Sequence, residues 1–254
     1  MAARVLITGA TGTLGRRVLP AASAAGHRVF ALSRRARTDE SAGVQWRCAD
    51  LLTGSGIDEA VDDVDVIVHC ATQGTRDKDV TSMQNLTSAA RRAGVDHLIH
   101  VSIVGIDEIP LPYYRTKLRV ERVLEGSGVE HTVLRATQFH DLIATTFSLQ
   151  RYSPVLCALR NVRFQPIDTR DVANRLVELV GSAPAGRVRD IGGPTVHTHA
   201  ELARQYLSAR RSRRPAIALP VPGRIVAGYR SGANLAPDNP VGTIVFSEYL
   251  AAAN

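Results

Sequence analysis

A short apolar run followed at once by three regularly spaced glycines constrains the fold of this chain more than any other feature. Residues 5–7, Val-Leu-Ile, predict a buried strand. Gly9, Gly12 and Gly15 follow at intervals of three, and residues 16–25 have a helical composition. In the order strand, turn, helix, a backbone without Cβ atoms admits a pyrophosphate, and the amide groups at the start of the helix face it. The stretch therefore predicts a dinucleotide-binding turn.

Size and composition limit what else the chain can be. With 254 residues, 44% hydrophobic and 22% charged, it can bury the core of one α/β domain with a small C-terminal elaboration. No apolar window approaches the roughly 18 residues of a membrane helix, and the start shows no signal-peptide pattern. We therefore expect a cytoplasmic protein without a membrane partner. Cys48, Cys70 and Cys157 are odd in number and widely spaced, which favours reduced thiols in a core over disulfides or a metal knuckle.

Arginine dominates the positive charge. The formal net charge is +7, and only Lys78 and Lys117 are lysines among the 31 basic residues. A cofactor with several phosphates would favour a positive cleft, whereas such a bias is weak evidence for nucleic acid, so we expect no nucleic-acid partner. The densest run, residues 210–214, is typical of a solvated helix end.

The second predicted strand, residues 27–32, is followed by hydroxyl and guanidinium groups. Residues 16–25 form its crossover helix, in which Pro20 predicts a kink or a place in the first turns. An NAD-preferring site would place a carboxylate after this strand to bind the ribose hydroxyls. Ser33, Arg34 and Arg35 stand there instead and would bind a 2′-phosphate, Arg34 as the main contact and Arg35 as the second. The sequence therefore predicts NADP(H) in preference to NAD(H).

Two further strands and a helix complete the first half of the chain. Residues 43–50 alternate as a strand that stops at Asp50 and Leu51. Residues 64–70 form a fourth strand that opens into the small residues Ala71, Thr72, Gln73 and Gly74, which can pass close beneath a cofactor. A helix over residues 79–93 ends at Gly94. This alternation predicts a doubly wound parallel sheet with its ligand at the carboxyl ends of the strands.

A Y-x-x-x-K pair follows the fifth strand. Residues 97–101 deliver Ser102, and Tyr113 and Lys117 lie four apart on a predicted helix, which puts both side chains on one face. A phenol has an ordinary pKa of about 10, and an ammonium nearby favours the phenolate, which suits proton transfer at neutral pH. Tyr114 is the alternative proton donor if the helix is rotated.

Residues 8–15, Thr-Gly-Ala-Thr-Gly-Thr-Leu-Gly, resemble the fingerprint of the extended and atypical short-chain dehydrogenases/reductases, the NmrA-like group in particular. This resemblance implies a Rossmann-type fold with Tyr113, Lys117 and Ser102 as the catalytic residues. Ile103 stands where that family commonly keeps a second hydroxyl residue, a departure seen in atypical members. The implied cofactor-binding residues are Gly9, Thr11, Gly12, Thr13, Leu14, Gly15, Ser33, Arg34, Arg35, Asp50, Leu51, Ala71, Thr72, Lys117 and Thr137.

Within this resemblance, Asp50 lies beside the adenine, and residues 134–141 flank the nicotinamide. The backbone of this run, at Thr137, would contact the cofactor, with Phe139 and His140 facing substrate. A lone histidine is more often a hydrogen-bonded structural group than a catalytic acid.

The later half predicts a substrate region. We expect residues 1–140 to form the NAD(P)-binding core and residues 141–254 a smaller, partly intertwined region whose return segment near 163–180 rejoins the core. Residues 142–159 are mostly apolar and predict a loosely helical wall. Asp168 and Asp171 are first-turn capping groups of a helix. Residues 187–193 predict a late strand, residues 198–209 a helix, and the tail 234–254 a cover for the pocket. His197 and His199 lack carboxylate or cysteine partners, so no metal site is expected.

The combined motifs predict an NADP-dependent oxidoreductase that moves hydride between the nicotinamide and a small, fairly hydrophobic carbonyl, alcohol or conjugated alkene such as a quinone or ketone. Tyr113 would be the proton donor. The alternatives are a non-catalytic NADP(H)-binding redox sensor of the NmrA-like type, which Ile103 favours, and a sugar-nucleotide epimerase or dehydratase. The expected partner is a small-molecule substrate, and the expected state is a monomer or homodimer.

Overall fold

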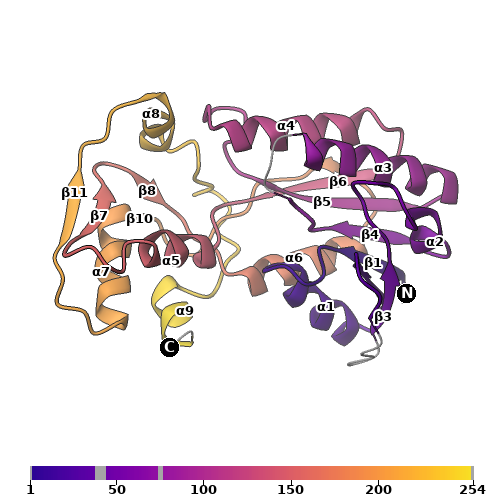
Figure 1. Ribbon diagram of the computed structural model, residues 1–254, viewed down its shortest axis with the longest axis horizontal. Helices are drawn as coiled ribbons and strands as arrows, with labels where there is room; N and C mark the ends of the chain where they lie inside the picture. Colours follow the sequence, from indigo (N-terminus) through magenta and orange to yellow (C-terminus); the bar gives the residue numbers. More distant parts are fainter. Residues whose placement is uncertain (1, 38–43, 74–76, 253–254) are drawn as a thin grey trace. The chain divides into compact units, whose positions relative to one another are not determined.

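The structure, a computed structural model, describes residues 2–37, 44–73 and 77–252 (Figure 1). The predictions for Gly43 and Gly74 lie outside these residues. The chain forms two compact units, each built from three segments. Unit 1 comprises Met1–Ser102, Pro112–Leu134 and Val172–Val188, and unit 2 comprises Ile103–Leu111, Arg135–Asp171 and Arg189–Asn254.

A seven-stranded parallel sheet with the order β3-β2-β1-β4-β5-β6-β9 organises unit 1. The order runs outward in both directions from β1, which confirms the predicted doubly wound α/β fold of the Rossmann type. Strands β5 and β6 continue at their carboxyl ends into unit 2. The strands are β1 (Arg4–Thr8), β2 (Arg28–Ser33), β3 (Val44–Cys48), β4 (Val66–His69), β5 (His97–Ile103), β6 (His131–Ala136) and β9 (Gly186–Arg187).

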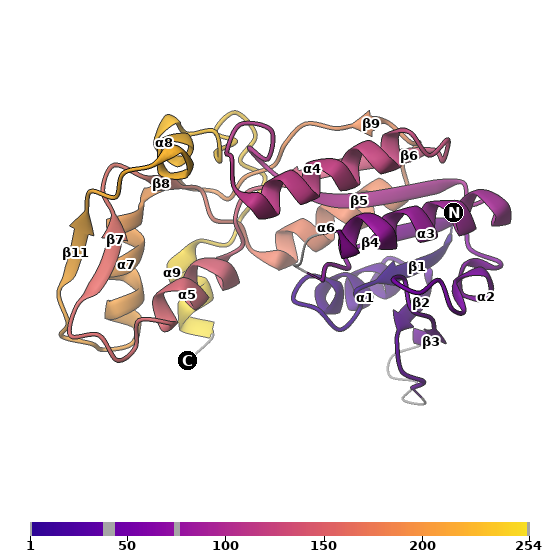
Figure 2. The same cartoon turned by 45° about the horizontal axis from the view of Figure 1, so that its top comes forward.

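Helices cover both faces of this sheet, as Figures 1 and 2 show. One face carries α3 (Lys78–Ala93) and α4 (Pro112–Glu125), and the other carries α1 (Gly15–Ala24) and α6 (Thr169–Val180). The short α2 (Ile57–Val61) follows β3. Because neither face meets solvent, Val5, Leu6 and Ile7 are all fully buried, which is why the first strand reads as a continuous apolar run.

Capping residues and glycine set several helix ends. Gly94 ends α3 in the left-handed conformation, with a φ of 69°, as its position predicted. Thr198 and Glu201 form a capping box at the start of α7 (His199–Ala209). Pro20 lies inside α1, beyond its first turn.

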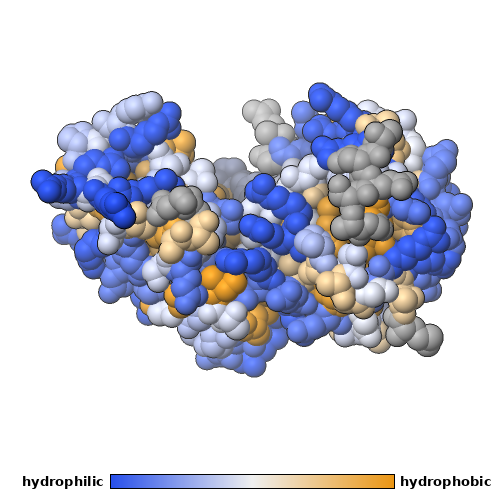
Figure 3. All heavy atoms as spheres, turned by 90° about the horizontal axis from the view of Figure 1, so that it is seen from below, coloured by the Kyte–Doolittle hydropathy of each residue, from blue (hydrophilic) through white to orange (hydrophobic). Residues whose placement is uncertain are grey.

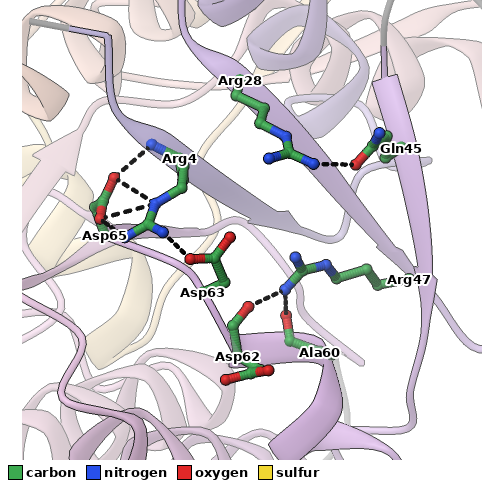
Figure 4. Close-up of polar contacts among 8 residues, drawn as sticks. All are labelled: Arg4, Arg28, Gln45, Arg47, Ala60, Asp62, Asp63 and Asp65. Atoms are coloured by element: carbon green, nitrogen blue, oxygen red, sulfur yellow. Dashed lines mark hydrogen bonds and ion pairs between the residues drawn. The ribbon is translucent and has the colours of Figure 1, made fainter.

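Two arginines of the central sheet bind neighbouring segments of the chain (Figure 4). Arg4 on β1 binds both carboxylate oxygens of Asp65, and it also pairs with Asp63. The Arg47 guanidinium lies 3.6 Å from the Phe30 ring centroid and donates to the carbonyl oxygens of Ala60 and Asp62. Arg4 and Asp65 lie at the edge opposite the glycine turn, because β1 begins at Arg4 and ends next to Gly9, whereas Arg47 lies near the carboxyl end of β3, beside Leu32 of β2. We therefore assign this cluster to stability.

Unit 2 holds two small sheets and the remaining helices. Strand β7 (Leu156–Leu159) pairs in parallel with β11 (Ala216–Leu219), and β8 (Arg163–Phe164) pairs antiparallel with β10 (His197–Thr198). Its core includes Phe147, Leu156, Leu202, Tyr206 and Phe246. The helices are α5 (His140–Ser148), α7, α8 (Arg224–Ser231) and α9 (Phe246–Ala252).

Three expectations from the sequence are corrected here. Residues 142–159 are not loosely helical throughout, because α5 ends at Ser148 and β7 pairs with a strand some sixty residues later. The late strand expected over 187–193 is the two-residue β9, with Ile191 adding a single bridge to Ala136. All three cysteines are free, but Cys48 is exposed rather than in a core.

Across the described residues, we find no helix with both the length and the apolar composition that crossing a bilayer requires.

Candidate functional site

The glycine turn after β1 is closed so tightly that Cβ atoms are excluded. Gly9 has a φ of +65°, and a Cβ there would lie 2.6 Å from the backbone nitrogen of Ala71. A Cβ on Gly15 would lie 2.1 Å from the carbonyl oxygen of Gly9. The Gly12 amide donates to that same oxygen at 2.9 Å. The turn is therefore folded on itself and pressed against the end of β4, as a backbone cradle for a phosphate requires.

The start of α1 leaves its positive end available to an anion. Leu14 occupies the N-cap without a side-chain hydrogen bond, and the first turn has no acidic residue. Arg16 and Arg17 stand there instead, both exposed. The amides of Arg16 and Arg17 already donate to the carbonyl oxygens of Gly12 and Leu14, at 3.2 and 2.8 Å, so it is the positive end of the helix dipole that attracts negative charge. The residues present fit a diphosphate, and Thr11 (exposed) and Thr13 (half-buried) add hydroxyl groups beside it.

Positive side chains follow β2. Arg34 and Arg35 are exposed, and the Ser33 hydroxyl accepts a hydrogen bond from the Arg35 amide at 3.3 Å. The Arg37 guanidinium lies 4.6 Å from the ring centroid of Trp46 on the neighbouring β3. No carboxylate occurs between residues 27 and 37. This end of β2 therefore suits an added phosphate group.

The loop after β3 is fixed by its own hydrogen bonds. The Asp50 carboxylate accepts from the Leu52 amide at 2.8 Å, and Leu51 is buried. The Asn85 carboxamide on α3 donates to the carbonyl oxygens of Leu51 and Leu52, at 2.9 and 3.1 Å. Sequence reasoning did not identify Asn85, because an asparagine in mid-helix carries no motif that shows its partner.

A buried carboxylate links the loop after β4 to α4. Asp79 Oδ2 lies 3.1 Å from Lys117 Nζ and accepts from the Thr72 hydroxyl at 2.7 Å. Asp79 Oδ1 accepts from the Gln73 amide at 2.6 Å. The side chains of Asp79 and Lys117 are only 4% and 6% exposed, so two opposite charges share a site with little water. Sequence reasoning named Asp79 only as a helix start, and its place in the first turn of α3 was the available signal.

Tyr113 joins this group from α4. Its hydroxyl lies 3.4 Å from Thr72 Oγ1, and Lys117 Nζ lies 5.6 Å from its ring centroid. The four-residue spacing thus brings Tyr113 and Lys117 to one face of the helix. Tyr113 is half-buried, whereas Tyr114 is only 4% exposed on the inner side of α4. This orientation favours Tyr113 over Tyr114 as the group that meets a substrate.

Charge compensation sets the ionisation of the carboxylate. Burial alone raises the pKa of Asp79, but the Lys117 ammonium and the hydrogen bonds from Gln73 and Thr72 outweigh it, so the pKa is lowered. Asp79 is therefore ionised at neutral pH, and its charge balances that of Lys117.

Two buried histidines, His69 and His100, lie side by side on the neighbouring strands β4 and β5. His69 Nδ1 lies 2.8 Å from the Thr8 hydroxyl at the end of β1, and the rings of His69 and His100 are 5.4 Å apart. Burial, with a contribution from the Lys117 charge, lowers the pKa of His69 to about 3. The imidazole is consequently neutral and serves to orient Thr8. The sequence offered no signal for this contact between adjacent strands.

Ser102 is placed differently from Tyr113 and Lys117. It is 3% exposed at the end of β5, and its hydroxyl has no hydrogen-bond partner among the residues that the structure describes. Ile103, the next residue, is half-buried.

Three candidate residues in unit 2 have structural contacts. The Thr137 hydroxyl donates to the carbonyl oxygen of Gln165 at 2.5 Å. His140 is fully buried, Nε2 lies 3.0 Å from the carbonyl oxygen of Ile244, and burial lowers its pKa. His199 Nδ1 accepts from the Leu159 amide at 2.9 Å. Within the described ranges, no group of three or more potential metal ligands is found.

Only one of the two predicted capping carboxylates caps α6. Asp168 Oδ1 accepts from the Arg170 amide at 2.8 Å, as a first-turn cap does. Asp171 instead accepts from the amides of Thr243 and Ile244 and from the Thr243 hydroxyl. Its role is to hold the chain before α9, a long-range contact that capping preference does not show.

Comparison with known proteins identifies a family and several similar proteins. A family model described as NAD(P)H-binding matches residues 9–182. The Photosystem II assembly factor Ycf39 of Trieres chinensis is 25% identical over 181 residues, which are 66% of this chain but only 57% of that protein's length. A (4-alkanoyl-5-oxo-2,5-dihydrofuran-3-yl)methyl phosphate reductase of Streptomyces griseus is 28% identical over 206 residues, covering 79% of this chain and 72% of the reductase.

Among solved structures, the Escherichia coli NADPH-dependent quinone oxidoreductase QOR2 complexed with NADPH has the same fold. It matches with a TM-score of 0.82 and 18% identity, over 98% of this chain and 99% of the other.

Proposed function

The chain belongs to the NAD(P)H-binding family, and from this premise we propose that it is an NADP(H)-dependent oxidoreductase. Its substrate would be a small, fairly hydrophobic carbonyl, alcohol or conjugated alkene, such as a quinone or ketone. Of the similar proteins described above, one is named a reductase and one a quinone oxidoreductase, which supports this reaction class. The single observation that carries the proposal is the contact of Tyr113, Thr72, Asp79 and Lys117 beside the glycine turn.

Each residue has a defined task in this proposal. The glycine turn and the start of α1 bind the diphosphate, and Arg34 and Arg35 bind the 2′-phosphate. When bound, the nicotinamide supplies or accepts the hydride. Tyr113 exchanges a proton with the substrate oxygen through its hydroxyl. Lys117 keeps a positive charge near that hydroxyl, and Asp79 fixes the ammonium and the Thr72 hydroxyl in place.

Turnover of a substrate panel tests the proposal. NADPH absorbance is followed with quinones, ketones, aldehydes and conjugated enones, and we expect oxidation with at least one hydrophobic member. Oxidation that is absent with every compound, in a protein that binds NADPH, would overturn the enzymatic assignment.

We expect Arg34 and Arg35 to set the cofactor preference. Charge-assisted hydrogen bonds to a phosphate contribute about 1.5–3 kcal/mol, so Arg34→Ala with Arg35→Ala should weaken NADPH binding at least about tenfold. NADH lacks the 2′-phosphate, so its dissociation constant should stay the same. Titration calorimetry with both nucleotides measures the difference. Arg91→Ala, an exposed arginine on α3, is the matched control, and an equal loss for NADPH and NADH would contradict the assignment.

A non-catalytic redox sensor is the second candidate, favoured by two observations. Ile103 stands in place of a hydroxyl residue, and the Ser102 hydroxyl is buried. A sensor would bind NADP(H) and turn over none of the panel, so the same experiment separates the two functions.

A further inference from the structure

Two segments of unit 2 contain arginine but no acidic residue. Residues 142–167 and 202–237 include no aspartate or glutamate, although the whole chain has 24 acidic residues. The first segment carries Arg151, Arg160 and Arg163, and the second carries Arg204, Arg210, Arg211, Arg213, Arg214, Arg224 and Arg230. Such a separation of charge creates a positive field that neighbouring carboxylates do not cancel.

The fold brings these two segments together. Strands β7 and β11 pair over their whole length, from Leu156 with Ala216 to Leu159 with Leu219. The Arg214 guanidinium donates to the carbonyl oxygens of Gln150 and Ser153, at 2.8 and 3.1 Å. The turn over residues 149–153 therefore lies against the segment just before β11. The Arg214 and Arg230 guanidiniums donate to the carbonyl oxygens of Arg151 and Arg160, which brings arginines of the two segments together.

Apolar side chains are exposed among these arginines. Helix α7 packs on β7 and β11 (Figures 1 and 2). Along β11, Ile217 and Leu219 alternate outward and are 40% and 41% exposed. Leu149 and Tyr152 in the adjoining turn are 73% and 86% exposed. We call Leu149, Tyr152, Ile217, Leu219 and Val221, with the exposed Arg151, Arg160, Arg211 and Arg213, the β11 surface.

Figure 3 shows unit 2 from another side. Strongly hydrophilic side chains gather there, with apolar ones between them. Clusters of exposed apolar residues mark binding sites on proteins, so the composition of the β11 surface points to a specific kind of partner.

Although the sequence alone led us to expect no membrane partner, we propose that the β11 surface binds peripherally to an anionic lipid bilayer. The arginines would pair with lipid phosphates, and Leu149, Tyr152, Ile217 and Leu219 would enter the boundary between headgroups and acyl chains. A second copy of the chain is a poor occupant, because a symmetric contact would place arginine against arginine without carboxylates from these segments. Nucleic acid would use the arginines but not the exposed aliphatic side chains.

Vesicle co-sedimentation of the full chain tests this. The wild-type protein should pellet with vesicles of phosphatidylglycerol and phosphatidylcholine, but not with phosphatidylcholine alone, and rising salt should release it. Arg211→Glu with Arg213→Glu should weaken binding at least about tenfold. Leu149→Ser with Tyr152→Ser should also weaken it. Arg91→Glu with Arg122→Glu, two exposed arginines of unit 1, changes the net charge equally and should bind like the wild type.

Other outcomes would overturn the proposal. The first is that the wild-type protein does not pellet with anionic vesicles at low salt. The second is that the two charge-reversal variants lose vesicle binding equally. The third is that the Leu149→Ser, Tyr152→Ser protein binds vesicles as well as the wild type does. If the wild type forms a dimer that the β11-surface variants do not form, the surface binds a second copy of the chain instead. If the protein binds a nucleic-acid oligonucleotide but no vesicle, the surface binds nucleic acid instead. Circular dichroism and NADPH titration show that each variant is folded, and neither readout depends on lipid.

Discussion

Replacing Tyr113 with phenylalanine is expected to lower kcat by about 10²–10⁴-fold, the usual contribution of a positioned proton donor. The substitution removes only the hydroxyl that lies 3.4 Å from Thr72 and leaves the ring beside Lys117. NADPH affinity should therefore be unchanged. Steady-state turnover with the best substrate of the panel, together with NADPH titration, measures both quantities.

Tyr114→Phe is the matched control for this experiment, because it makes the same chemical change one residue away, on the inner side of α4. Its kcat should stay close to that of the wild type. Full turnover by the Tyr113→Phe protein would show that the proton comes from another group, and a loss confined to Tyr114→Phe would move the role to that residue.

Replacing Asp79 with asparagine is expected to reduce the free energy of unfolding by about 3–5 kcal/mol, the usual cost of removing one partner from a buried ion pair. The change is nearly isosteric but leaves the Lys117 ammonium buried without its counter-charge. Urea denaturation at neutral pH measures the loss. Asp58→Asn, which breaks the exposed pair with Arg92, should cost no more than about 1 kcal/mol. Equal losses in the two variants would contradict a special role for the buried pair.

Acidification should remove the difference in the free energy of unfolding between the wild type and Asp79→Asn. Asp79 has a lowered pKa in the folded protein, so its ionised form contributes stability above the unfolded-state value of about 3.9. That contribution is lost as the pH falls through the folded pKa, whereas asparagine does not titrate. The gap between the two denaturation midpoints should therefore be constant near neutrality and close in strong acid. A gap that persists there would show that asparagine destabilises by altered packing.

Local patterns were enough to predict the central sheet and the cofactor turn. The apolar run before Gly9, the stop at Gly94 and the helix expected over residues 198–209 are all set by neighbours in sequence. The structure confirms them, with the last helix spanning His199–Ala209. The resemblance to atypical short-chain dehydrogenases/reductases is likewise confirmed by the family match and the shared fold.

Long-range contacts could not be predicted in the same way. Asp79 and Lys117 are 38 positions apart, so nothing near either residue shows that each neutralises the other. Strand β7 depends on β11, and Asp171 depends on Thr243, both across long stretches of chain.

The position of Trp46 gives the protein an intrinsic optical reporter. It is the single tryptophan of the chain, stacks with Arg37, and lies on β3 alongside the end of β2, where Arg34 and Arg35 follow. Nucleotide binding at that strand end would change the emission of the indole without any label. Energy transfer from the indole to the nucleotide would quench the tryptophan emission further only when the nucleotide is reduced. The reason is that only the dihydronicotinamide ring absorbs at the wavelengths where tryptophan emits. A single fluorescence titration would thus distinguish occupancy of the adenosine end from the oxidation state of the bound cofactor.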